Sequence, residues 1–180
     1  MKIAVILTIN AASSVAVIST IITTMSQLRV LLIEDNPIVI SGLRRAISKN
    51  FANAKLLSVT SPDEVLAKVN SQPVGSWDII LLDFVYSAGT GNFHVFDIEK
   101  FGPQRVISIS STGFGNEAAQ ARGVTHVKPK SYLHFNKFLR DTIDEMKSMI
   151  DNNSNHNNWL HYQIQAIAYD KWFELVLDRI

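Results

Sequence analysis

The chain has 180 residues, enough for one domain with extensions or for two very small domains. Hydrophobic residues make up 47% of it and charged residues 18%, which is ample for one buried core. Seventeen Lys and Arg side chains against sixteen Asp and Glu leave a net charge of +1, which argues against a nucleic-acid surface or a polybasic membrane patch. The sequence contains no cysteine, which excludes disulfides, thiolate metal sites and a cysteine nucleophile, and fits a cytoplasmic protein.

Residues 1–26 form an apolar N-terminal extension, and no charged side chain occurs between residues 3 and 28. The run over residues 3–24 is long enough to cross a bilayer, although it is rich in Ser, Thr and Asn. It is therefore a membrane anchor, a signal peptide, or a segment outside the folded unit because translation starts at Met25. We favour the third interpretation, and we expect contact with a membrane only under the first.

The main domain is expected over residues 27–150 and opens with a strand and a helix. Residues 30–33 (VLLI) are a short apolar run bounded by acidic residues and a proline, which is typical of a buried strand. Pro37 suits the first turn of a helix, and the apolar residues that follow it share one face as far as about residue 49.

A second strand is predicted over residues 55–59, and the sequence Ser-Pro-Asp-Glu after it predicts a helix start. Ser61 can cap this helix, Pro62 suits its first position, and Glu64 can complete a capping box. Three more strands are predicted over residues 77–82, 106–109 and 124–127, and they alternate with helices near residues 95–100, 116–122 and 133–150.

Five strands that alternate with helices predict an α/β fold with a parallel sheet covered on both faces. The strands are apolar runs without a period of two, which indicates that both of their faces are buried. In such sheets ligands bind at the carboxyl ends of the strands. The residues that directly follow the strands are therefore the candidates for function.

Polar side chains that follow four of the strands would meet at one edge of the sheet: Glu34, Asp35, Asp83, Ser110, Ser111 and either Lys128 or Lys130. Three crowded carboxylates repel one another and would favour a divalent cation, and oxygen ligands suit Mg²⁺. A carboxylate beside Mg²⁺ can attack a phosphoryl group, because the metal neutralises charge on the transferred oxygens. A nearby hydroxyl and ammonium would then hold the oxygens of the resulting acyl phosphate.

Four segments in this order resemble the receiver domains of two-component response regulators: VLLIEDN, WDIILLDF, RVISISS and GVTHVKPKS. The resemblance covers about residues 28–150. It implies a flavodoxin-like, doubly wound, five-stranded parallel sheet of order 2-1-3-4-5 with helices on both faces. Each segment alone is common, and their order and separations carry the resemblance.

The resemblance also implies roles for individual residues. Asp83 would be the phosphoacceptor and a Mg²⁺ ligand. Asp35 would bind Mg²⁺ directly, Glu34 would act directly or through water, and the backbone carbonyl of Val85 would supply a further ligand. Ser110 would be the switch hydroxyl that moves toward the phosphoryl oxygens.

The lysine of the site is either Lys128, which precedes a proline, or Lys130, which lies seven residues after Gly123. Both features are typical of the family's lysine. We prefer Lys130, because its separation from the glycine leaves room for a full strand. The aromatic switch residue of the family would then correspond to Val127, and the neighbouring His126 should point to the other side of the strand.

The resemblance implies a signalling domain and not a conventional enzyme. A sensor histidine kinase or phosphotransfer protein would pass a phosphoryl group to Asp83, which would lose it slowly. Signalling would run through a downstream protein partner or a homodimer, without nucleic acid. The loop after Asp83 (FVYSAGTGNF) lacks the family's Met-Pro turn, which leaves a pseudo-receiver that is never phosphorylated as an alternative. An aspartyl phosphohydrolase is disfavoured, since Val85 stands where it usually has a second Asp.

The end of the chain is expected to lie outside the main domain. Residues 151–158 (DNNSNHNN) are polar and predict a linker, and residues 159–180 predict an amphipathic helix. About 22 residues are too few for a DNA-binding output domain. This helix would instead dock on the main domain, dimerise or bind a partner.

Overall fold

The computed structural model describes residues 27–152, and the predictions for residues 1–26 and 153–180 lie outside this range. Its centre is a parallel sheet in the order β2-β1-β3-β4-β5, which confirms the predicted order. The strands are β1 (Arg29–Ile33), β2 (Lys55–Val59), β3 (Ile79–Leu82), β4 (Val106–Ser108) and β5 (His126–Val127).

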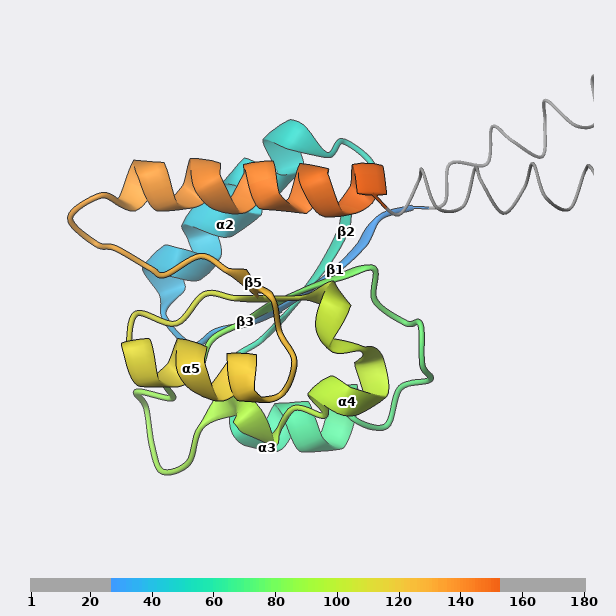
Figure 1. Ribbon diagram of the computed structural model, residues 1–180, viewed down its shortest axis with the longest axis vertical. Helices are drawn as coiled ribbons and strands as arrows, with labels where there is room; N and C mark the ends of the chain where they lie inside the picture. The colour runs from blue at the N-terminus through green and yellow to red at the C-terminus, as the bar shows by residue number, and fades with distance from the viewer. Residues whose placement is uncertain (1–26, 153–180) are drawn as a thin grey trace, which may run out of the picture.

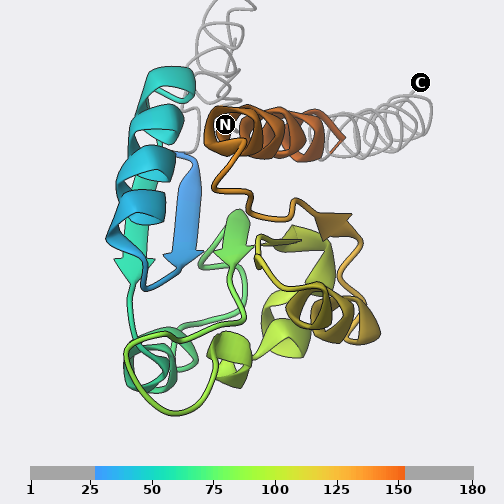
Figure 2. The same ribbon diagram turned by 90° about the vertical axis from the view of Figure 1, so that its left-hand side faces the viewer.

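Helices cover both faces of the sheet, as predicted (Figure 1). Within residues 27–152, α2 and the helix over residues 135–152 lie on one face, and α3, α4 and α5 lie on the other, an arrangement also visible after rotation in Figure 2. The bounds are α2 (Pro37–Asn50), α3 (Pro62–Glu64), π-helical η1 (Val65–Val69), 3-10 turns η2 (Phe93–Val95) and η3 (Pro103–Arg105), α4 (Ile98–Phe101) and α5 (Gly113–Ala121). None of the helices within the described range is both long and apolar enough to cross a membrane.

The hydrophobic core has two layers, one on each face of the sheet. Successive side chains of a strand point to opposite faces, so each strand supplies both layers. Leu31 and Leu82 pack with Phe93 on one face, whereas Val30 and Leu81 pack on the other face with residues of α2 and of the 135–152 helix. Both faces of the central strands are fully buried, as the apolar runs predicted.

Two helices begin at other residues than predicted, because side-chain caps fix their starts. The hydroxyl of Thr112 accepts a hydrogen bond from the amide of Gly115, so α5 begins at Gly113, three residues early. The carboxylate of Asp97 accepts from the amide of Lys100, so α4 begins at Ile98 after the separate turn η2. Gly113 and Gly115 stand in the first turn of α5, and the low helix propensity of glycine explains why this start was not predicted.

Three strands are shorter than predicted, and one helix is shifted. The strand expected over residues 106–109 ends at Ser108 as β4. The strand expected from residue 77 begins at Ile79, because the carboxylate of Asp78 binds the backbone amide and guanidinium of Arg29. The strand expected over residues 124–127 is hydrogen-bonded as β5 at two residues. The last helix begins at residue 135 and still includes residues 151 and 152, which were assigned to the linker.

Candidate functional site

The carboxylates that follow β1 and β3 converge at the carboxyl edge of the sheet. Glu34, Asp35 and Asp83 each offer an oxygen, and these three oxygens lie within 4.8 Å of one another. The strands make this possible, because β1 and β3 are adjacent and parallel with Ile33 opposite Leu82. Glu34 and Asp83 are buried, at 0% and 1% exposure, whereas Asp35 is half-buried.

Lys130 lies between the two buried carboxylates. Its Nζ donates to Asp83 Oδ2 at 2.6 Å and to Glu34 Oε2 at 2.7 Å, and its side chain is only 3% exposed. Lys128, the alternative, instead pairs with Glu145 of the 135–152 helix at 2.6 Å. The structure therefore places Lys130, and not Lys128, against the carboxylates.

Backbone amides occupy the remaining oxygens of the two buried carboxylates. Glu34 Oε1 accepts from the amide of Asn36 at 3.0 Å, and Asp83 Oδ1 accepts from the amide of Phe84 at 2.7 Å. These bonds hold each side chain at the end of its own strand. The orientation of the carboxylates is therefore fixed by the chain before any ligand binds.

Burial and crowding act on the protonation of this site. Burial, reinforced by the negative charge of Asp83, raises the pKa of Glu34 to about 7, although the Lys130 ammonium acts in the opposite direction. Burial alone would lower the pKa of Lys130, but the charges of Glu34 and Asp83 outweigh it and leave this pKa raised. Lys130 is thus a permanent cation at neutral pH, and the site has a deficit of positive charge.

The loop after β3 folds over Asp35. The amide of Ser87 donates to Asp35 Oδ2 at 2.6 Å, which ties the loop to the outermost carboxylate. Val85 pairs with Asn92 in an isolated antiparallel bridge, so the loop turns back on itself where the family has its Met-Pro turn. Val85, the predicted carbonyl ligand, thus lies in an ordered segment two residues after Asp83.

Ser110 is fully buried at the end of β4, on the same edge as Asp83. Its hydroxyl lies 3.1 Å from the hydroxyl of Thr112, and its carbonyl accepts from Asn116 Nδ2 at 3.0 Å. Asn116 Oδ1 also accepts from Ser108 at 2.7 Å. By contrast, Ser111 is exposed.

Two residues that support Ser110 were not predicted from the sequence. Asn116 was assigned only to a helix, although a buried Asn that joins two serines fixes the end of β4. Only glycine fits at position 115, because a Cβ there would lie 2.5 Å from Phe84 Cβ and 2.6 Å from Ser110 Oγ. The Ser-Ser-Thr-Gly-Phe-Gly-Asn sequence after the fourth strand could have indicated both residues, because it contains a helix-capping threonine followed by small and polar residues.

His126 and Val127 occupy β5, where the aromatic switch of the family was sought. His126 Nδ1 lies 2.6 Å from Glu145 Oε1, so this ring faces the 135–152 helix. Glu145 thereby binds both His126 and Lys128, which joins β5 to the helix that packs over it.

Comparisons with known proteins rest on structure alone, since no family model and no curated protein sequence matches the chain. The response regulator domain of Thermotoga maritima CheB aligns with a TM-score of 0.54 at 19% identity, covering 69% of this chain and 96% of that one. The phosphorylated cyanobacterial phytochrome response regulator RcpA aligns at 0.50 and 17% identity, covering 64% and 88%. The chain has the fold of a response-regulator receiver domain.

The receiver fold also matches part of a longer protein. NtrX from Brucella abortus aligns with a TM-score of 0.53 at 15% identity over 72% of this chain, which spans 29% of the NtrX chain. Structural similarity at identities this low establishes the fold alone, so the chemistry must be argued from the site itself.

Proposed function

We propose that this receiver domain accepts a phosphoryl group on Asp83 from the phosphohistidine of a sensor histidine kinase or phosphotransfer protein. The observation that carries the proposal is the convergence of Glu34, Asp35, Asp83 and Lys130 at the carboxyl edge of the sheet. A buried aspartate, two further carboxylates for a cation and one fixed ammonium are the groups that phosphoryl transfer to a carboxylate requires.

The donor set fits Mg²⁺. Opposite ligands of an octahedral Mg²⁺ ion lie about 4.2 Å apart, close to the 4.8 Å within which the three carboxylate oxygens lie. Glu34, Asp35 and Asp83 would hold the ion, with the backbone carbonyl of Val85 as a further ligand. Bound there, Mg²⁺ supplies charge neutralisation for the transferred oxygens.

The residues of this chain divide the work of transfer. A carboxylate oxygen of Asp83 forms a bond to phosphorus as the bond from phosphorus to the donor's imidazole nitrogen breaks, and the freed imidazole takes up a proton. Lys130 already donates to Asp83 and stays charged, so it can hold a phosphoryl oxygen as well. The Ser110 hydroxyl would turn from Thr112 toward another phosphoryl oxygen, and the loop after β4 would follow it.

Labelling with acetyl phosphate in the presence of Mg²⁺ tests the proposal. The wild-type chain should gain one phosphoryl group by mass spectrometry and lose it in hydroxylamine, which cleaves acyl phosphates. Asp83→Asn should gain none, and the exposed Asp63→Asn should label like the wild type. Labelling of Asp83→Asn equal to that of Asp63→Asn would refute the assignment.

A pseudo-receiver that serves only as an interaction module is the second candidate. The bond from the Ser87 amide to Asp35 favours it, because the loop already satisfies an oxygen that a cation would use. Such a domain would show no Mg²⁺-dependent change in intrinsic fluorescence and no labelling of the wild type. The same experiment therefore separates the two functions.

A further inference from the structure

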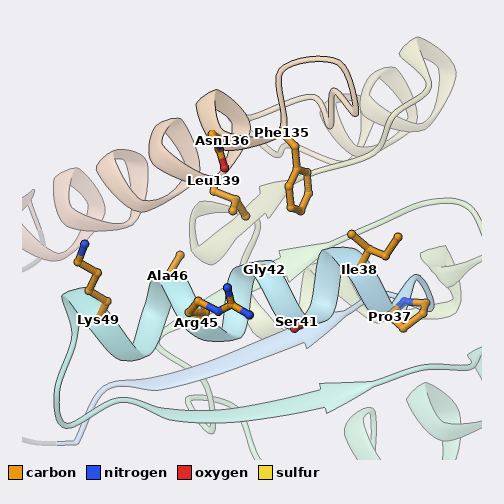
Figure 3. Close-up of a pocket in the computed structure, with 10 residues that line it drawn as sticks. All are labelled: Pro37, Ile38, Ser41, Gly42, Arg45, Ala46, Lys49, Phe135, Asn136 and Leu139. Carbon is orange, nitrogen blue, oxygen red and sulfur yellow. The ribbon is translucent and has the colours of Figure 1, made fainter.

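A groove lies between α2 and the start of the 135–152 helix. These two helices cover the face of the sheet away from α3, α4 and α5 (Figure 1). Figure 3 shows Phe135 and Leu139 pointing down toward α2, and Ile38 and Ala46 pointing up toward the other helix. The groove has a volume of about 630 Å³. Gly42 forms its floor, where Phe135 approaches so closely that a Cβ would lie 2.8 Å from the ring.

The groove joins apolar walls to a basic edge. Ile38 is 64% exposed although it lines the groove together with Phe135 and Leu139. The groove therefore leaves apolar surface uncovered within the described part of the chain. Arg45 and Lys49 line the same groove from α2. Neither forms an ion pair with another residue between 27 and 152. An occupant should therefore be an apolar helix with acidic side chains at its margin.

The C-terminal segment of this chain has that pattern. Apolar residues recur at alternating steps of three and four, which is the spacing of one helical face: Trp159, Tyr162, Ala166, Tyr169, Phe173 and Val176. Asp170 and Glu174 are four residues apart, so they lie next to each other on a helix and beside this face. They complement the basic edge formed by Arg45 and Lys49.

The chain length also fits. The helix over residues 135–152 is about 26 Å long, and a helix over residues 159–177 would be about 27 Å long. The polar residues 153–158 can span up to about 20 Å, which is enough to reverse direction. An antiparallel helix would thus start beside residue 152 and reach the groove at Phe135 and Leu139.

We propose that residues 159–177 fold back as a helix into the groove between α2 and the 135–152 helix. A tethered segment meets the groove at a high effective concentration, which favours it over the same segment of a second copy. The groove begins at Pro37 and Ile38, directly after Asp35 and Asn36. A partner that reaches the carboxylates along α2 would therefore first displace the C-terminal segment. The docking itself does not depend on phosphorylation of Asp83.

Disulfide crosslinking tests the docking, because the full chain contains no native cysteine. Ser41 is exposed in the groove and would lie near Val176, so we pair Ser41→Cys with Val176→Cys. The control pairs Val176→Cys with Gln120→Cys, which is exposed on α5 across the sheet. Under mild oxidation we expect the first pair to form an intramolecular disulfide about tenfold faster than the control. Equal rates, or disulfide-linked dimers in place of the intramolecular product, would overturn the proposal.

Charge reversal adds a second readout that a general loss of folding would not reproduce. Arg45→Glu with Lys49→Glu should slow crosslinking of the first pair about threefold, the size expected for one or two exposed ion pairs. Adding Asp170→Lys and Glu174→Lys should restore the rate. A rate that is insensitive to the first reversal, or that stays low after the second, would contradict the proposed register.

Discussion

Removal of the Lys130 ammonium should destabilise the domain far more than removal of the ammonium of Lys128, which also forms an ion pair but is more exposed. Lys130 is 3% exposed at its side chain, and its two carboxylate partners are 0% and 2% exposed. Lys130→Met would leave two buried carboxylates without their cation. Breaking a buried ion pair in this way costs about 3–5 kcal/mol, which for a domain of this size lowers Tm by about 10–20 °C.

Urea unfolding followed by circular dichroism at pH 7 with EDTA measures this loss. Lys128→Met is the matched control, since Lys128 also pairs at 2.6 Å but its side chain is 30% exposed. We expect the control to cost less than about 1 kcal/mol. Mg²⁺ should recover part of the loss in Lys130→Met, because a divalent cation can replace the missing charge. If Lys130→Met were as mild as Lys128→Met, the account of the site as a buried, charge-deficient cluster would be wrong.

Further predictions concern protonation, metal binding and packing. Without Mg²⁺, the free energy of unfolding should fall by at most about 3 kcal/mol as pH rises from about 4.5 to about 7. The raised pKa of Glu34 makes the folded state bind more protons in this window, so Glu34→Gln should flatten urea-unfolding profiles; an unchanged slope would contradict this. Mg²⁺ should raise the Tm of the wild type, and Asp35→Asn should weaken that shift in a thermal melt; an equal shift in both would remove Asp35 from the ligand set. Gly115→Ala should cost about 1–3 kcal/mol in urea, because its Cβ would clash with Phe84. Gly113→Ala should be neutral, because its Cβ would meet only Glu117 Oε1 at 4.0 Å; equal effects would refute the packing argument.

Much of the fold was readable from local sequence. Strands buried on both faces are apolar throughout, so VLLI and IILL indicated their positions without tertiary information. The start of α2 was equally local: Pro37 predicted it, and the side chain of Asn36 caps it by accepting from the amides of Ile38 and Val39. The start of β3 was predicted wrongly because a distant contact decides it: the bond between Asp78 and Arg29 joins residues 49 positions apart. The starts of α4 and α5 were predicted wrongly although their caps, Asp97 and Thr112, are local.

The sequence alone determined that carboxylates follow β1 and β3. It also predicted that they meet, because a parallel sheet brings the carboxyl ends of its strands to one edge. It did not determine which lysine would reach them. Lys128 and Lys130 differ by two positions, and the tertiary structure decides between them by giving Lys128 to Glu145 and burying Lys130 between Glu34 and Asp83. The physical reason is that a strand's length and the path of its loop depend on packing against the 135–152 helix. The separation from Gly123 favoured Lys130, but no local pattern contains information about that contact.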